Sequence, residues 1–407
     1  MKKRLLLACM LGATTFLQAQ INSNPGTHNW SSTTAWAGGV VPTSTDEVNI
    51  TSNSIITLDI PVSHDTSIHI LNGGQLQSLL PANSLTVNGG DVTLAGFGAV
   101  LQFAGSGAPV PVSITDGHLI NGGVFMSGDL LIDNSSGTGQ SENNGDFMVM
   151  GNMTLDGTEL FENNLGMNVN GLFDVAADCE YNNNQSATLH SVHNMGTFEN
   201  AGSATLSDTL WNAADLLTSG SYMDIEGSII NTGDFVIEDS IHCNEDLTNS
   251  GTFTNYTVIH IANDFYNSGT ITGDSSAFYL IGQNSENAAA GMIDGNIDIC
   301  DTTLTGQYLD IMTGSADYNT VTFCSVSYAS LDEQQSDLIS VFPNPANEQI
   351  TIAGVTSGNY VIYSADGRIV KSNTIIGPID LSDFQSGAYI IKITSENRKF
   401  NTVFFKR

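Results

Sequence analysis

Two histidines are the sharpest candidates for a metal site in this chain. His242 and His260 each lie 11 residues after an asparagine of a repeated N-x-G pattern. If each period forms one coil, their imidazoles stack on neighbouring coils, with Phe278 next in the same column. Two imidazoles bind a transition metal when a carboxylate or Cys243 completes the ligand set. Without that third ligand, the column is a packed aromatic strip.

Paired carboxylates are the second candidates, because glycosidases use two acidic side chains roughly 5 to 9.5 Å apart. Asp298 with Asp301, and Glu238 with Asp239, are such pairs in the sequence. The chain contains 42 acidic residues, however, so chance pairs are expected and a solvated acidic face explains them better. No calcium-loop motif is present, and we expect no cofactor beyond diffuse screening of the carboxylates by Ca²⁺.

The charge of the chain is distributed very unevenly. Lys and Arg number 10 against 42 acidic residues, which gives a formal net charge of −32. Three of the basic residues lie at positions 2–4 and the other seven between 368 and 407, so residues 5–367 contain none. Such a surface repels phosphate and anionic lipid, which excludes nucleic acid and membrane surfaces as direct partners of this region. It also disfavours a polysaccharide lyase, which needs cationic groups opposite an acidic sugar.

Residues 1–19 have the pattern of a secretory signal peptide, with a basic start, an apolar stretch and a small residue at Ala19. An alternative lipoprotein box ending at Cys9 leaves only about four apolar residues before the cysteine, against roughly 7 to 15 in an ordinary signal. No later segment reaches the roughly 18 apolar residues that a membrane-spanning helix needs. We therefore expect an exported chain without a membrane-spanning segment.

Four cysteines remain after the signal peptide: Cys179, Cys243, Cys300 and Cys324. No CxxC pair exists, so zinc-site and thioredoxin-like interpretations have no support. Export permits disulfides, and among the three possible connectivities we favour Cys300 with Cys324, which are closest in sequence. Buried free thiols are almost as good an explanation for the other two.

An asparagine recurs at intervals of 18 or 19 residues through the middle of the chain. Glycine follows two positions later in four of the five copies, where we expect a left-handed turn. The copies are Asn194 with Gly196, Asn212 with Ala214, Asn231 with Gly233, Asn249 with Gly251, and Asn267 with Gly269. Looser copies at Asn72, Asn88, Asn121 and Asn143 extend the pattern upstream. A period of this length predicts a solenoid in which the asparagines stack as an amide ladder.

Two apolar columns accompany the asparagines. One lies four positions after each asparagine and the other two positions before it; the columns are Phe198, Leu216, Phe235, Phe253 and Ile271, and Val192, Leu210, Ile229, Leu247 and Phe265. Stacked coils would join these residues into one core. We predict a β-solenoid (parallel β-helix) over residues 60–325, with roughly 14 coils from about residue 50. A β-sandwich array is the alternative, but its strands do not repeat one asparagine offset through five consecutive units.

The segment 20–59 contains Trp30, Trp36, a Gly-Gly pair, Pro42 and a D-x-V-x-I motif from Asp46. It resembles the opening segment of Bacteroidetes surface β-helix proteins and, more distantly, the G8 domain. The resemblance implies a cap on the first coil, which otherwise exposes a strand edge. Alternatively, the two tryptophans form a platform on which sugar rings stack.

The end of the chain carries the most specific motifs. After a linker at 326–341 come FPNP (Phe342, Pro343, Asn344, Pro345), a turn at Asp366-Gly367, GAYIIKI with Gly387 and Tyr389, and the terminal Lys406-Arg407. Their order resembles the C-terminal sorting domain of the type IX secretion system, the Por secretion tail, over residues 342–407. The alternating apolar residues predict a small β-sandwich. The resemblance implies recognition by the type IX machinery and removal of the tail by its surface protease.

Together these patterns predict an all-β protein, exported to the outer-membrane surface or the medium, with a β-solenoid passenger and a sorting tail. The function we favour is a surface adhesin or structural protein, with glycans or other surface proteins as candidate partners. The alternatives are a carbohydrate-active, glycosidase-like β-helix enzyme and a carbohydrate-binding module. An enzyme needs a cleft with two converging carboxylates, whereas an adhesin can present a smooth rod.

Overall fold

The computed structural model describes residues 20–103, 109–135, 140–219, 222–324, 340–353, 358–364, 368–395 and 398–407. The predicted signal peptide, most of the linker and the Asp366-Gly367 turn lie outside these residues. The chain divides into two compact units, Met1–Val326 and Ser327–Arg407. Each unit is described separately below.

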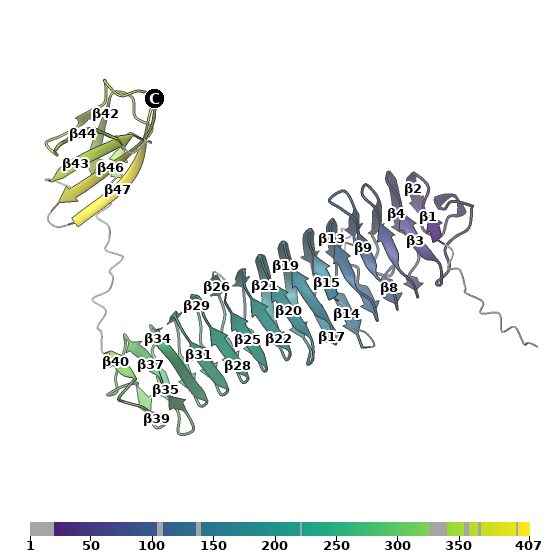
Figure 1. Cartoon of the computed structure of the whole chain (residues 1–407), viewed down its shortest axis with the longest axis horizontal. Coiled ribbons are helices and arrows are strands. Elements are labelled where there is room, and N and C mark those ends of the chain that lie inside the picture. Colours follow the sequence, from purple (N-terminus) through teal and green to yellow (C-terminus); the bar gives the residue numbers. More distant parts are fainter. Residues whose placement is uncertain are drawn as a thin grey trace, which may run out of the picture. The chain divides into compact units, whose positions relative to one another are not determined.

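The first unit is a β-solenoid, as the repeat predicts (Figure 1). It has about 13 turns, against the roughly 14 expected from the repeat. Its parallel strands form three columns; each complete coil contributes one strand to each column, whereas the first and last coils contribute to the first two columns only. The first column consists of β1 (Gln20–Asn22), β3 (Glu47–Ile50), β6 (Ile68–Ile70), β9 (Val92–Leu94), β12 (Leu119–Asn121), β15 (Gln140–Asn143), β18 (Leu160–Asn163), β20 (Glu180–Asn183), β22 (Thr197–Asn200), β25 (Asp215–Thr218), β28 (Asp234–Ile237), β31 (Thr252–Asn255), the start of β34 (Thr270–Leu280), β36 (Met292–Ile293) and β39 (Ser315–Ala316).

The second and third columns complete each coil. The second consists of β2 (Gly26–Asn29), β4 (Ser54–Leu58), β7 (Gln75–Ser78), β10 (Val100–Gln102), β13 (Val124–Ser127), β16 (Asp146–Val149), the starts of β19 (Gly166–Val175) and β21 (Ser186–Asn194), β23 (Ser203–Leu206), β26 (Tyr222–Ile225), β29 (Ile241–Cys243), β32 (Val258–Ile261), the end of β34, β37 (Asn296–Asp301) and β40 (Thr322–Cys324). The third consists of β5 (Val62–His64), β8 (Leu85–Asn88), β11 (Val112–Thr115), β14 (Leu130–Asn134), β17 (Met153–Gly157), the ends of β19 and β21, β24 (Leu210–Asn212), β27 (Ile229–Asn231), β30 (Leu247–Asn249), β33 (Phe265–Asn267), β35 (Ser285–Asn287) and β38 (Ile311–Met312).

The strands alternate between buried and solvent-facing side chains, which places one continuous apolar core along the inside of the coils. Both predicted apolar columns lie in this core. Phe235 pairs with Phe253 in the first column of strands, and Ile229 pairs with Leu247 in the third. Within each column, every strand except the first and the last is hydrogen-bonded on both edges, so the apolar residues of the inner coils are covered by neighbouring coils.

Asparagine side chains form a hydrogen-bonded ladder at the end of the third-column strands. In the ladder Asn194, Asn212, Asn231, Asn249, Asn267 and Asn287, each Nδ2 donates to the next Oδ1 at 2.8 Å. Each amide also donates to a backbone carbonyl of the next coil, as Asn249 does to Thr270 at 3.1 Å. These buried amides are therefore satisfied by one another and by the backbone.

The looser upstream copies do not extend this ladder, so that part of the predicted register is wrong. Asn121 and Asn143 belong to a second ladder, at the end of the first-column strands, which runs Asn121, Asn143, Asn163, Asn183 and Asn200. Asn72 lies in neither ladder, and its Oδ1 accepts from the Gly98 backbone N–H; Asn88 instead bonds Ser63. Two corners of the coil use the same chemistry, and N-x-G spacing alone does not say which corner a copy occupies.

The repeated turn requires glycine for a different reason from the one predicted. None of Gly196, Gly233, Gly251 and Gly269 is among the positive-φ residues of the described chain. Instead, a Cβ on Gly251 would lie 2.1 Å from the Gly233 carbonyl oxygen. At these four glycines the backbones of successive coils approach too closely for a side chain, which explains the glycine without a left-handed turn.

The N-terminal segment belongs to the same stack, since β1 to β4 pair within the first and second columns. Within the described residues, the sole helical segment is the 3₁₀ turn η1 (Thr33–Ala35) between them. Trp30 and Trp36 are both buried, with ring centroids 4.9 Å apart, and the Trp36 indole N–H donates to the Trp30 carbonyl at 2.8 Å. The rings extend the core, and neither lies open to a sugar.

The second unit contains two small antiparallel sheets around a separate core. One sheet orders β41 (Ser340–Phe342), β42 (Gln349–Ala353) and β45 (Ile379–Asp380); the other orders β44 (Ile369–Thr374), β43 (Asn359–Ser364), β46 (Gly387–Ser395) and β47 (Arg398–Lys406). Ile350, Ile362, Ile391 and Phe404 are fully buried between them. This agrees with the predicted small β domain.

Candidate functional site

The FPNP motif of the tail is fixed against the last strand of the chain. The Asn344 side chain donates to the Val403 carbonyl at 3.1 Å and accepts from the Phe405 backbone N–H at 2.9 Å. The peptides before Pro343 and Pro345 are cis. The Arg407 backbone N–H donates to the Ala346 carbonyl at 2.9 Å, so the motif and the Lys406-Arg407 terminus form one structural element.

The GAYIIKI strand supplies the aromatic centre of the tail. Tyr389 packs between Phe384 and Phe404, with ring centroids 5.0 and 5.6 Å away, and its hydroxyl donates to the Gln385 carbonyl at 2.8 Å. Gly387 begins this strand. Motif residues that lie far apart in sequence are thus brought together by one core.

A pocket of about 820 Å³ lies on the tail beside β44 and the start of β46. Its lining includes Arg368, Lys371, Asp383 and Phe384. The Lys371 ammonium lies 5.9 Å from the Phe384 ring and donates to the Asp380 carbonyl. With Asp383 as the one acidic residue of its lining, this pocket does not provide the carboxylate pair of a glycosidase.

The carboxylate pairs singled out in the solenoid do not converge. Asp298 is exposed on β37, whereas Asp301 at the end of the same strand is buried and accepts hydrogen bonds from Ser285 and Thr303. Glu238 is exposed in a corner, and Asp239 accepts from the Ser240 backbone N–H. Asp298 and Glu238 thus face solvent, whereas Asp301 and Asp239 accept hydrogen bonds from neighbouring residues.

The histidine column is present but differs from the prediction in its third member. His242 and His260 pair on adjacent coils with ring centroids 5.1 Å apart, and Tyr279, not Phe278, comes next, with its ring 5.0 Å from His260. Compared with the preceding coil, the corner within β34 contains one additional residue, and Ser275 there has φ 56°. The additional residue moves Phe278 into the core. Cys243 also faces the core.

No group of three or more His, Cys, Asp or Glu side chains in the described part of the chain could hold a metal ion. By their ring contacts, the histidines form part of an aromatic strip that also contains Tyr222, whose ring is 6.3 Å from that of His242. Burial and the neighbouring His242 lower the pKa of His260.

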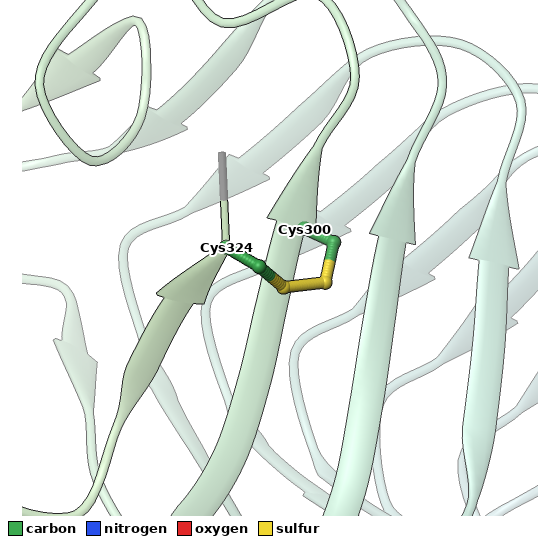
Figure 2. Close-up of a disulfide and its surroundings, with 2 residues drawn as sticks. All are labelled: Cys300 and Cys324. Atoms are coloured by element: carbon green, nitrogen blue, oxygen red, sulfur yellow. A yellow bond between two sulfur atoms is a disulfide. The ribbon is translucent and has the colours of Figure 1, made fainter. Parts of the chain in front are cut away.

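A disulfide joins Cys300 to Cys324 near the end of the solenoid, which is the pairing favoured from the sequence (Figure 2). The two residues are register partners on β37 and β40, with Cα atoms 4.7 Å apart. Cys179 and Cys243 are buried free thiols. Burial raises the pKa of Cys179 to about 11 and that of Cys243 to about 12, so both remain protonated at neutral pH.

We expect the disulfide to hold the last coil in place. Replacing both Cys300 and Cys324 by serine should destabilise this end by about 3.5 kcal/mol, the loop-closure estimate for a 24-residue separation. Backbone amides of β40 should then exchange hydrogen faster, while those of β27 should not, because each coil contacts only its neighbours. Cys179→Ser is the control; equal exchange in β40 of the double variant and wild type would contradict this role.

Glu159 is a buried acidic residue that the sequence did not single out. Its carboxylate has no exposed surface, lies 3.5 Å from His118 Nδ1 and accepts from the Asn134 side chain at 3.3 Å. Burial raises its pKa, while Ser141 and His118 oppose that shift. Nothing in the local sequence marks it, because its burial depends on how neighbouring coils meet at the corner.

The raised pKa of Glu159 predicts that its ionisation lowers the stability of the folded protein at high pH. Above this pKa the folded state holds a buried charge that the unfolded chain solvates, so Glu159→Gln should raise the melting temperature at pH 8. Below the ordinary glutamate pKa both states carry the proton, so the difference between variant and wild type should vanish near pH 4. Glu199→Gln, at an exposed site, is the control. A variant that melts below wild type at pH 8 would show that His118 outweighs the burial cost.

Comparison with known protein families identifies the tail. Residues 340–406 match the secretion system C-terminal sorting domain. This tail implies export through the type IX secretion system, to the cell surface or beyond it, and interaction with that machinery. Searches of curated proteins and of solved structures gave no match for the chain. No helix in the described residues is long and apolar enough to cross a membrane.

Proposed function

We propose that the protein is an adhesive or structural rod on the surface of a Bacteroidetes bacterium. The observation that carries this proposal is the combination of a sorting tail with a solenoid whose candidate catalytic acids do not converge. The export route delivers the solenoid outside the cell, and the regular coils present a long, evenly built surface. An adhesin or a structural component requires both.

The lack of Lys and Arg in the solenoid suits a protein that is exposed to proteases outside the cell. Residues 5–367 contain no Lys or Arg, so proteases of trypsin specificity have no cleavage site in the solenoid. We further propose cleavage of the signal peptide after Ala19 and removal of the tail by the surface protease between Tyr328 and Phe342. The mature rod would then lack all ten basic residues of the chain.

Adhesion by the producing bacterium tests this function. A strain lacking the gene should attach less to polysaccharide-coated surfaces, or aggregate less with its own kind, and the full-length gene should restore both. Unchanged attachment and aggregation would contradict the proposal. Release of reducing sugar from polysaccharides by the purified chain would instead support the glycosidase alternative.

A further inference from the structure

The outer side of the third column carries a row of outward side chains that includes three rings. On successive coils the outward positions are His193, Trp211, Ile230, Thr248 and Tyr266, each the register partner of the next. Trp211 is 46% exposed and Tyr266 is 39% exposed. The Trp211 ring lies 4.6 Å from that of His193, whose Nδ1 lies 2.9 Å from the Asp174 carboxylate, so a fixed neighbour orients the indole.

An ordered polar row borders these rings. Two positions before the outward residues, and therefore on the same side of the sheet, lie Ser228, Asp246, Asp264 and Asn284. Asp246 Oδ1 accepts from the Asn263 side chain at 2.6 Å and from the Asp264 backbone N–H at 3.0 Å. Asp264 in turn accepts from the Asn284 side chain at 2.9 Å. The two carboxylates are thus held as directed acceptors beside the outward row, with Asp264 next to Tyr266.

From these observations we infer that this row binds an uncharged polysaccharide chain lying along the solenoid axis. Aromatic faces stack on the C–H surfaces of sugar rings, and the adjacent carboxylates accept hydrogen bonds from sugar hydroxyls. Trp211 and Tyr266 are three coils apart, about 14 Å at one strand spacing per coil. That distance accommodates several sugar rings of one extended chain.

The charge of the solenoid and the width of the apolar strip decide between a neutral glycan, an acidic glycan and a protein as the partner. Without Lys or Arg in residues 5–367, an acidic glycan would be repelled. A second copy of this chain would bring together two surfaces of a protein with net charge −32. The apolar strip is one side chain wide and is interrupted by Thr248, whereas stable protein interfaces bury about 800 Å² per partner around an apolar centre. A single glycan chain fits the strip better than a protein surface.

Quenching of tryptophan fluorescence tests the inference directly, because Trp30 and Trp36 are buried and Trp211 is the remaining tryptophan. In the full-length chain, neutral polysaccharides such as mixed-linkage β-glucan, galactomannan or dextran should protect Trp211 from acrylamide. Affinity electrophoresis should show retardation by at least one of them. Polygalacturonate and alginate should give neither protection nor retardation.

Matched variants complete the test. Trp211→Ala should weaken binding about tenfold, the effect of losing one aromatic anchor, and adding Tyr266→Ala should abolish it. Tyr256→Ala is the control, since Tyr256 is 48% exposed but lies in a corner between the first and second columns. The inference would be overturned if no neutral polysaccharide retarded the chain, or if an acidic one retarded it more strongly. Unchanged binding by the double variant would also overturn it, as would self-association that is lost on Trp211→Ala.

This inference rests on the proposed adhesive function but can fail separately from it. If the double variant restores attachment to the deletion strain, the ring row is not the binding site although the protein is still an adhesin. If the purified chain binds neutral polysaccharide through Trp211 but the deletion strain attaches normally, the site stands and the adhesive role fails.

Discussion

Deleting residues 340–407 should leave the protein in the periplasm of its native host, with little or none at the surface or in the medium. The signal peptide predicted at residues 1–19 would direct the chain only across the inner membrane, and the sorting tail supplies the address for the next step. The solenoid forms a compact unit by its own contacts, so we expect the truncated chain to fold. Fractionation followed by immunoblotting measures the result.

Point variants in the tail show whether export fails because the sorting domain is lost or because the chain is shorter. Phe404→Asp places a charge in the fully buried core of the tail and should abolish export, because several kcal/mol of stability are lost from a small domain. Phe405→Asp is the matched control, since the Phe405 ring is 52% exposed on the same strand. A reporter carrying the signal peptide and residues 340–407 should reach the surface. Surface localisation of the truncated protein would refute the dependence on the tail.

The sequence predicted the solenoid because its repeat is both regular and chemically specific. From Asn194 to Asn267, one offset of asparagine and apolar residues fixes which side chains face inward, and the strand pairings follow it. Upstream, coils differ in length by several residues, so the N-x-G signal alone could not separate the two corners. A single additional residue near Ser275 also shifted the predicted position of Phe278 by one, which reverses the side of the sheet it faces.

The candidate sites were less accessible to sequence reasoning than the fold. Trp30 and Trp36 attract attention as a pair, yet whether a ring is buried depends on how the first coils close around it. Trp211 occurs once, without a recurring motif, and becomes informative only when the register places it on the same row as Tyr266. Glu159 is distinguished only by burial. Such properties arise from contacts between coils, which local patterns do not encode.

The largest expected effect on stability comes from Phe253→Asp. Phe253 is fully buried, with its ring 5.0 Å from Phe235 and 5.8 Å from Phe278 on the neighbouring coils. Loss of a buried phenyl ring costs about 3–5 kcal/mol, and a buried carboxylate without a partner adds several more. Because each coil is covered by the next, the damage exposes the apolar faces of two neighbouring coils. We expect the middle of the solenoid to unfold at a much lower temperature, measured by circular dichroism and by proteolysis with chymotrypsin.

Two further variants show whether the loss of stability in Phe253→Asp comes from burying the charge or from introducing it anywhere on this strand. Thr254→Asp introduces the same charge one residue later on β31, where the side chain faces outward, and should melt close to wild type. Asn249→Ala should have an intermediate effect of about 1–3 kcal/mol, because it removes one member of the ladder while Asn231 keeps its bond to the Thr252 carbonyl. The expected order of melting temperatures is therefore Thr254→Asp, then Asn249→Ala, then Phe253→Asp. Equal melting of the two aspartate variants would mean that Phe253 does not face the core, and the register of the whole first column would then be wrong.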